Sequence, residues 1–298
     1  MYPRIIVMVL SIAAADLAHA ESVPPEDANV PAPETFGETA AGHGSLWASY
    51  TNTFEHDVWV KPDQKKAPYG TVRLQGAFLG GSYNVTDDWS IDGSIRYVDN
   101  VARPLGKPEQ DVSGLQDATL GAIWHKNVSG YEITTSATAT IPVRDYEIVG
   151  GAYAGQHLRQ LLLGISLAHQ FDFTHIYYRL GYGYAFSQKV LGFDTGYQRY
   201  DAELGWFVND RFSVNAFLTG RGGFGLTAFE TVHALATGTL TALQRAQVSE
   251  HSYRAWGLGA DYDFGNRYVA SCNVQHTYWG ANVFDAKYAL EARLTRNF

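Results

Sequence analysis

The sequence has little of what usually stabilises a small secreted domain or a metalloprotein. Cys272 is its only cysteine, so no disulfide can form within the chain and no cysteine-based metal site is expected. After the first twenty residues, no apolar run is long enough for a membrane-spanning helix. Strongly basic segments are also lacking, and the formal net charge is −8. The lack of basic segments and the negative net charge argue against a nucleic acid as a partner.

The first twenty residues have the pattern of a secretory signal peptide. MYPR is a short basic start, IIVMVLSIAAA is an apolar run, and Ala18-His19-Ala20 is a small-residue cleavage site. The alternative is an N-terminal structural helix, which Asp16 within the segment disfavours. We therefore expect residues 1–20 to be a signal peptide, the mature chain to begin at Glu21, and export to occur in a Gram-negative bacterium.

Residues 21–44, ESVPPEDANVPAPETFGETAAGHG, contain four prolines and five acidic residues but no lysine or arginine. Low hydrophobicity combined with charge of one sign prevents a segment from burying enough surface to fold. The composition therefore predicts a flexible acidic linker. This linker carries five of the eight net negative charges, so the rest of the chain is only weakly acidic.

From Ser45 onward, apolar and polar residues alternate in a chain that is rich in aromatic residues and glycine. The whole chain contains 19 Tyr, 15 Phe, 7 Trp and 30 Gly. In YEITTSATATI (residues 131–141), most odd positions are apolar and the even positions are polar up to Thr140. A period of two is typical of strands with one apolar and one wet face. Segments of this kind, about long enough for tilted strands to cross a bilayer, are 45–56, 69–83, 89–99, 115–127, 131–141, 159–170, 176–186, 197–207, 212–221, 251–264, 268–279 and 286–298.

The last segment, YALEARLTRNF, alternates up to its end and finishes on Phe298. C-terminal tails usually fray, so a complete strand at this position indicates that the end of the chain is paired. An open sheet edge cannot be satisfied in lipid. We therefore expect the last strand to pair with the first.

The predicted connections alternate in length along the chain. Five are tight and polar, at residues 84–88, 127–130, 172–175, 208–211 and 265–267; six are longer, at 57–68, 100–114, 142–158, 187–196, 222–250 and 280–285. This layout predicts an all-β fold, a transmembrane antiparallel up-and-down β-barrel of about 12 strands in the cell outer membrane. The tight turns would be periplasmic and the longer loops extracellular. A secreted soluble sandwich or barrel is the alternative, which the apolar outward faces disfavour.

Aromatic residues beside the predicted connections fit the two girdles of such a barrel. The candidates are Trp89, Tyr131, Phe212, Phe264 and Tyr268 at the periplasmic end, and Trp59, Tyr146, Trp256 and Tyr278 at the outer end.

The polar faces of the strands would line the lumen. Two interpretations remain open: a polar track for a solute, or a structural network that fills a narrow barrel. Twelve strands at ~4.8 Å spacing and ~40° tilt give a backbone radius of roughly 12 Å, which leaves at most a narrow path. The charged residues predicted to line the lumen are Arg73, Asp92, Arg96, Asp117, Glu132, Arg179, Asp201, Glu203, Asp261, Glu291 and Arg293, with Gln75 and Asn215 among the neutral ones.

Two of the longer loops are candidates for a lid or a mouth. In residues 222–250, Phe229, Val232, Leu240 and Leu243 recur near helical spacing and would form a short helix over the lumen. A mobile loop is the alternative, because Gly238 and several threonines weaken a helix. Tyr146 and Tyr153 in the loop at 142–158 would contact an apolar solute at the mouth.

An outer-membrane lipid hydrolase needs a serine beside a histidine that a third group orients. The sequence offers His251-Ser252 and His43-Gly44-Ser45. Neighbours on a strand point to opposite faces, and His43 lies in the linker, so neither pair predicts a triad. We therefore expect no enzyme, no catalytic residue, no cofactor and no metal.

Four stretches resemble the outer-membrane proteins of the meta-pathway of phenol degradation family: SGLQDATLGAIWH (113–125), ATIPVRDYE (139–147), YYRLGYGYAFS (177–187) and YQRYDAELGWFVNDRFSVNAFLTG (197–220). Members usually carry Pro-Thr-Gly-Asp where this chain has Pro142-Val143-Arg144-Asp145, so a different loop is expected there. The resemblance implies a channel or transporter for uptake of small hydrophobic or aromatic compounds by passive diffusion. The alternative is a structural or adhesive barrel without transport. The expected partners are membrane lipid, the small solute and, through the strand that ends in Phe298, the barrel assembly machinery; the barrel would be monomeric.

Overall fold

The computed structural model describes residues 16–18, 21–23, 41–59, 67–144, 148–149, 152–153, 157–171, 174–224, 247, 251–281 and 283–298. Apart from Gln247, which is helical, the regular elements in these ranges are β-strands. None of the described residues belongs to a helix with the length and apolar character needed to span a membrane.

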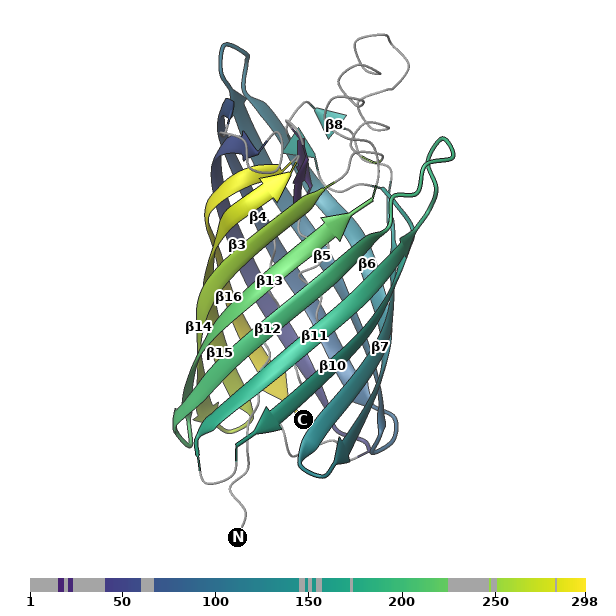
Figure 1. The fold of residues 1–298 in the computed structure, drawn as a ribbon, viewed down its shortest axis with the longest axis vertical. Helices are drawn as coiled ribbons and strands as arrows, with labels where there is room; N and C mark the ends of the chain where they lie inside the picture. The colour runs from purple at the N-terminus through teal and green to yellow at the C-terminus, as the bar shows by residue number, and fades with distance from the viewer. Residues whose placement is uncertain are drawn as a thin grey trace.

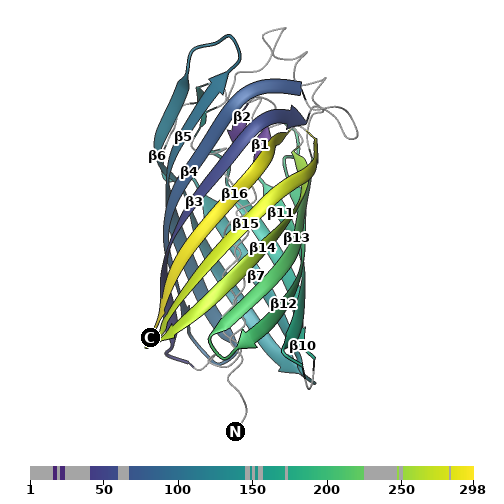
Figure 2. The same cartoon turned by 90° about the vertical axis from the view of Figure 1, so that its left-hand side faces the viewer.

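Twelve strands form a closed barrel in which each strand pairs antiparallel with the next, and β16 pairs with β3 (Figures 1 and 2). This confirms the predicted fold class. The strands are β3 (Gly44–Trp59), β4 (Ala67–Asn84), β5 (Trp89–Pro104), β6 (Gln110–Val128), β7 (Tyr131–Ile141), β10 (Gln160–Gln170), β11 (Ile176–Ser187), β12 (Tyr197–Asn209), β13 (Phe212–Gly223), β14 (Ser252–Gly265), β15 (Tyr268–Ala281) and β16 (Val283–Asn297).

The two ends of the barrel sheet meet along a continuous seam. Strand β16 pairs with β3 from Asn297 opposite Ser45 to Val283 opposite Trp59. Beyond Asn297, Phe298 N–H donates to the Gly44 carbonyl at 2.9 Å, and Gly44 N–H donates to the Phe298 carbonyl at 3.1 Å. Phe298 is therefore part of the ladder between β16 and β3.

Short turns connect the strands at the end of the barrel where the C-terminus lies (Figure 1). Between β6 and β7, Ser129 (φ 53°) and Gly130 (φ 84°) both adopt positive φ, the conformation that a two-residue hairpin turn requires. Between β12 and β13, the Asn209 side chain accepts hydrogen bonds from the N–H groups of Arg211 and Phe212. Tight turns of this kind mark the periplasmic end of outer-membrane barrels.

The connections at the other end depart from the prediction in one respect. The segment 280–285 was expected to be a longer loop, but β15 continues to Ala281 and β16 begins at Val283. Strands β5 and β6 likewise extend into the predicted loop 100–114 and leave only residues 105–109 between them. In β16 the alternation weakens because register shifts occur between Phe284 and Tyr288, and a bulge displaces side chains from the two-residue pattern.

Two small hairpins lie outside the barrel sheet: β1 (Asp16–Ala18) with β2 (Glu21–Val23), and β8 (Ile148–Val149) with β9 (Ala152–Tyr153). The predicted cleavage after Ala20 would separate β1 from β2. Most of the predicted signal peptide and linker lies outside the described residues.

The outward face of the barrel carries large apolar side chains that are exposed. Leu79 and Leu120 each expose 63% of their surface, and Leu204 exposes 56%. At the periplasmic end, the His169 ring stacks on Tyr131 with a centroid distance of 4.5 Å and also contacts Phe171. An apolar band flanked by aromatic rings is the surface that a barrel presents to lipid. Trp59 differs from the girdle prediction, because its Nε1 donates to Asp285 and it packs against buried residues.

Candidate functional site

Burial alternates along the strands and defines the face that lines the lumen. In β12, Arg199 and Glu203 are buried, whereas Tyr200 and Leu204 are exposed. The same alternation places most of the charged residues predicted for the lumen on the inward phase of their strands: Asp92, Arg96, Asp117, Glu132, Arg179, Asp201, Glu203, Asp261, Glu291 and Arg293. Asn215 is inward as well.

Arg73 and Gln75 do not line the lumen. In β4 the buried residues include Val72 and Leu74, so Arg73 between them is exposed on the outward face. Its Nε donates to Asn52 Oδ1 at 3.3 Å, and Gln75 donates to the Tyr50 hydroxyl. The prediction was wrong here because it assigned the polar side of every strand to the lumen, whereas the inward row of β4 is mainly apolar.

One cluster of charges joins β11 to β12. Arg179 donates to Glu203 Oε2 at 3.1 Å and lies 3.7 Å from Asp201 Oδ2. The Tyr177 hydroxyl donates to the other Glu203 oxygen at 2.7 Å. Charge-assisted hydrogen bonds are shorter and stronger than neutral ones, so this cluster holds its side chains in fixed positions on the wall.

A second polar row crosses neighbouring strands at matching register positions. Arg293 on β16 lies opposite Ser271 on β15, which lies opposite Asp261 on β14, which lies opposite Ser213 on β13. Ser213 Oγ donates to Asp261 Oδ2 at 3.0 Å. At the other end of the row, Arg293 donates to Glu291 at 3.0 Å. Its guanidinium also lies 4.5 Å from the centroid of the Trp47 ring.

Arg96 on β5 lies opposite a β-bulge in β6. The register between β5 and β6 shifts at this position, so that Gln116 and Asp117 are both buried although they are consecutive. The Arg96 guanidinium lies 4.4 Å above the Phe78 ring. A bulge is a conserved means of redirecting a side chain, and here it brings a second polar residue to the inner wall near Arg96.

Glycines on neighbouring strands let large inward side chains lie flat against the wall. Gly205 on β12 is covered by the Tyr177 ring, and Gly257 on β14 is covered by the Phe217 ring; a Cβ at either glycine would overlap the ring. At Gly76, a Cβ would lie 2.6 Å from Arg96 Nε. These side chains therefore run along the wall rather than toward the barrel axis. Sequence reasoning missed this arrangement because the pairing of strands has to be known before a glycine can be matched to its neighbour.

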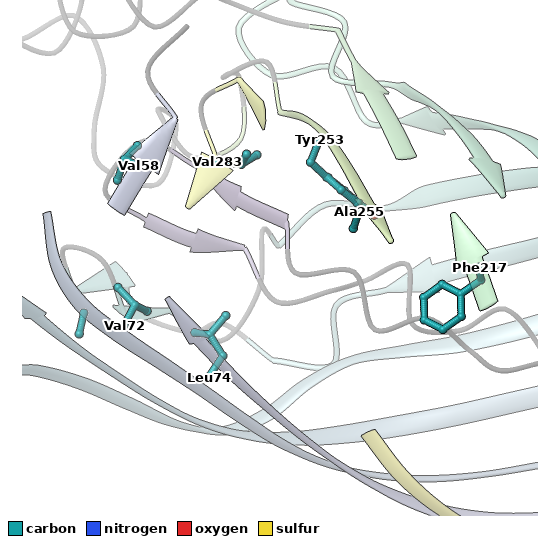
Figure 3. Close-up of a cluster of buried hydrophobic side chains, with 8 residues drawn as sticks. Val58, Val72, Leu74, Phe217, Tyr253, Ala255 and Val283 are labelled. Carbon is teal, nitrogen blue, oxygen red and sulfur yellow. The ribbon is translucent and has the colours of Figure 1, made fainter. Parts of the chain in front are cut away.

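Apolar residues gather inside the barrel toward the end opposite the short turns. Figure 3 shows the labelled members of this cluster on β3, β4, β13, β14 and β16. Trp59, Tyr69 and Val112 pack against it. We call the cluster the apolar collar; its members are Val58, Val72, Leu74, Ala102, Phe217, Tyr253, Ala255 and Val283. The sequence prediction of a uniformly polar lumen did not anticipate it.

Similarity to solved structures identifies the type of barrel. The COG4313 outer membrane channel from Pseudomonas putida F1 superposes with a TM-score of 0.68 at 12% identity, over 88% of this chain and 98% of that chain. This is the fold of an outer-membrane barrel. The β domain of the Bordetella autotransporter BrkA superposes with a TM-score of 0.53 at 12% identity, over 86% of this chain and 100% of that one.

The sequence comparisons do not assign a family. The scan against protein-family models gives no match, and the search of curated proteins gives none either. The resemblance to the meta-pathway of phenol degradation family is therefore not confirmed. Arg144, in the Pro142-Val143-Arg144-Asp145 segment that departs from the family pattern, donates to the carbonyls of Ser113 and Leu115.

The residues predicted to form a lid or a mouth are not placed. Phe229, Val232, Leu240, Leu243 and Tyr146 lie outside the described residues, and only the backbone of Tyr153 is described, in β9.

Two serines that stand next to or near a histidine in the sequence, Ser252 and Ser45, each have a hydrogen-bond partner from another strand. Ser252 Oγ accepts a hydrogen bond from Gly223 N–H at 3.1 Å. Ser45 Oγ forms a hydrogen bond with Ser82 Oγ at 2.9 Å. Within the described ranges, no group of three or more His, Cys, Asp or Glu residues could hold a metal ion.

Proposed function

We propose that this protein is an outer-membrane channel through which small solutes, apolar and aromatic compounds among them, diffuse passively. The observation that carries the proposal is the arrangement of the inner wall. Tyr177, Phe217 and Arg96 lie over glycines of neighbouring strands instead of crossing the lumen. A barrel whose interior served only as structural filling would direct its large side chains toward the axis.

The order of the two zones along the lumen supports an apolar or aromatic solute. The apolar collar lies toward the outer end, and the charged clusters around Arg179 and Asp261 lie toward the short turns. Removing apolar surface from water contributes about 25 cal/mol per Å², so an aromatic ring would gain by resting against Trp59, Tyr69 and Val112, the partly buried side chains that pack on the collar. Passage onward needs only weak binding, since a site that binds too tightly would retain its solute.

The proposal includes no catalytic step and no cofactor. It extends to assembly: we propose that the exposed ring of Phe298, at the end of β16, is presented to the barrel assembly machinery before the strand pairs with β3. A single chain closes the barrel, which is compatible with a monomer.

Liposome swelling tests the proposal and separates it from a structural or adhesive barrel. Proteoliposomes containing the folded protein are expected to take up phenol faster than a monosaccharide of similar size. Replacing Val112, which is partly buried against the apolar collar, by asparagine should slow phenol uptake roughly fivefold. This factor corresponds to about 1 kcal/mol of lost apolar contact.

Val112→Ile is the matched control, because it keeps the side chain apolar and should leave uptake almost unchanged. Heat-dependent migration on gels verifies that both variants are folded. Equal, negligible permeation of phenol and sugar through the unmodified barrel would support a structural role instead.

A further inference from the structure

The lumen carries more carboxylates than cations in the strands that the structure describes. The inward acidic residues are Asp92, Asp117, Glu132, Asp201, Glu203, Asp261 and Glu291, against the five inward arginines Arg96, Arg179, Arg199, Arg221 and Arg293. The outer end of the barrel also carries more acidic than basic side chains. Glu55 and Asp285 are buried there, and Lys287 forms salt bridges with both Asp285 and Asp57.

Four of these five arginines contact an aromatic ring or pair with a carboxylate. Arg96 lies over Phe78, and Arg293 lies over Trp47 while it donates to Glu291. The guanidinium of Arg221 is 3.5 Å from the centroid of Tyr197. Arg221 also pairs in register with Arg199, and this cationic pair lies two residues from Asp201 along β12, toward the outer end. Arg179 is paired with Glu203 and Asp201.

In the described part of the chain, single atoms without a hydrogen-bond partner occur on both kinds of group: the Nε of Arg179 and of Arg293, and one oxygen each of Asp261 and Glu291. Asp261 is 4% exposed, and Ser213 donates to its Oδ2, but its Oδ1 accepts no hydrogen bond within the described part of the chain. Glu291 is 3% exposed, and its Oε2 is in the same situation. Ser271 is a further hydrogen-bonding neighbour of the Asp261 carboxylate, and Ser49 and Asn273 are further neighbours of the Glu291 carboxylate. Buried polar atoms are nearly always paired, so Asp261 Oδ1 and Glu291 Oε2 can still accept a water molecule or bind a cation.

Asp261 lines a cavity at the end of the lumen that bears the short turns. The cavity has a volume of about 20 Å³, and three carboxylates (Asp261, Asp263 and Asp210) and one guanidinium (Arg211) line it together with Ser213 and Phe207. That is room for one water molecule or one small cation. The geometry favours an ion in transit over a resident metal, because the described residues offer no group of three ligands that could hold a metal ion.

We infer that the lumen is selective for cations over anions and that Asp261 is the residue that contributes most to this preference at the periplasmic end. The inference rests on the proposed channel function and refines its solute class: neutral and cationic small molecules pass, whereas anionic ones are disfavoured. Rings of carboxylates produce cation selectivity in other pores by the same electrostatic rule.

The test is the reversal potential of the full-length folded protein in an uncharged phosphatidylcholine bilayer across a KCl gradient. The sign of the reversal potential is expected to show that K⁺ permeates more readily than Cl⁻. Asp261→Asn should move the reversal potential toward zero while single channels still open. Asp88→Asn is the matched control, because Asp88 is in a turn at the same end of the barrel and pairs with Lys126 outside the lumen; it should leave the value unchanged.

A second readout uses two solutes of the same shape. Proteoliposomes should admit benzylammonium faster than benzoate, and Asp261→Asn should reduce that difference. A reversal potential of zero or of the sign for Cl⁻ in the unmodified protein would overturn the inference while leaving the channel function intact. An equal shift of the reversal potential in the Asp261 and Asp88 variants would show that Asp261 has no specific role in the selectivity. A folded barrel that carries no current at all would overturn the channel function and the inference together.

Discussion

Deletion of residues 283–298, the whole of β16 together with Phe298, is expected to abolish formation of the barrel. Strand β16 pairs with β15 on one side and with β3 on the other, so its loss exposes the N–H and C=O groups of two strand edges. Each backbone group left unpaired in hydrocarbon costs several kcal/mol, and the sum exceeds the stability of an ordinary domain. The truncated chain should show no heat-modifiable band on gels and should be degraded by protease in detergent.

Deletion of residues 24–40 is the control for this experiment. These residues belong to the predicted acidic linker and precede the barrel strands, so the shortened chain should still fold and resist protease. If the chain without β16 gave the same folded, protease-resistant species as the full-length protein, closure through the seam between β16 and β3 would be wrong.

Gly205→Val is expected to narrow or block the lumen and to destabilise the barrel. The valine side chain would overlap the Tyr177 ring, which covers Gly205, and would force that ring off the wall toward the axis. The same shift would stretch the hydrogen bond from the Tyr177 hydroxyl to Glu203. Overpacking of this kind typically costs about 1–3 kcal/mol. Single-channel conductance should fall, and denaturant should unfold the variant at a lower concentration.

Two further variants show whether the ring is responsible. Gly222→Val lies on the next strand, and a Cβ at Gly222 meets nothing within 4 Å, so both conductance and stability should stay near those of the unmodified protein. Adding Tyr177→Ala to Gly205→Val should restore conductance, because the displaced ring is gone. Conductance that stayed low in the double variant, or fell equally in Gly222→Val, would contradict this explanation. Either result would show that the flat packing of Tyr177 does not determine the width of the lumen.

Alternation of apolar and polar residues was sufficient to predict the strands and their closure. The segment predicted at 131–141 coincides with β7, and the one predicted at 176–186 differs from β11 by one residue. A period of two follows directly from strand geometry and is strong wherever one face contacts lipid. The alternation in residues 288–298 was informative for the same reason, since a strand in lipid needs a partner along its whole length.

The interior was less predictable, because polarity alone does not say which face points inward. Arg73 was assigned to the lumen from its polarity, but the inward residues of that strand are Val72 and Leu74. The outward Arg73 lies toward the outer end of β4 and is hydrogen-bonded to Asn52, so a polar residue is tolerated on the outward face there. Only the burial of the neighbouring residues distinguishes the two assignments.

Contacts between strands were beyond the reach of the sequence. The match between Gly205 and Tyr177, the bulge at Gln116 and Asp117, and the grouping of Leu74 with Tyr253 in the apolar collar all depend on register. Register is set by the turns and by the shear of the closed barrel together. A one-residue slip would exchange the inner and outer faces of a strand, so these features become visible only once the pairing is known.

Single-channel recording of the unmodified, folded protein in a planar bilayer tests most directly whether the lumen forms a continuous path. Because the large side chains lie along the wall, discrete current steps are expected, with a conductance smaller than that of a wide general porin. A barrel that inserts, migrates as a folded species on gels and passes no current under any applied voltage would show that the lumen is closed and that the protein is not a channel.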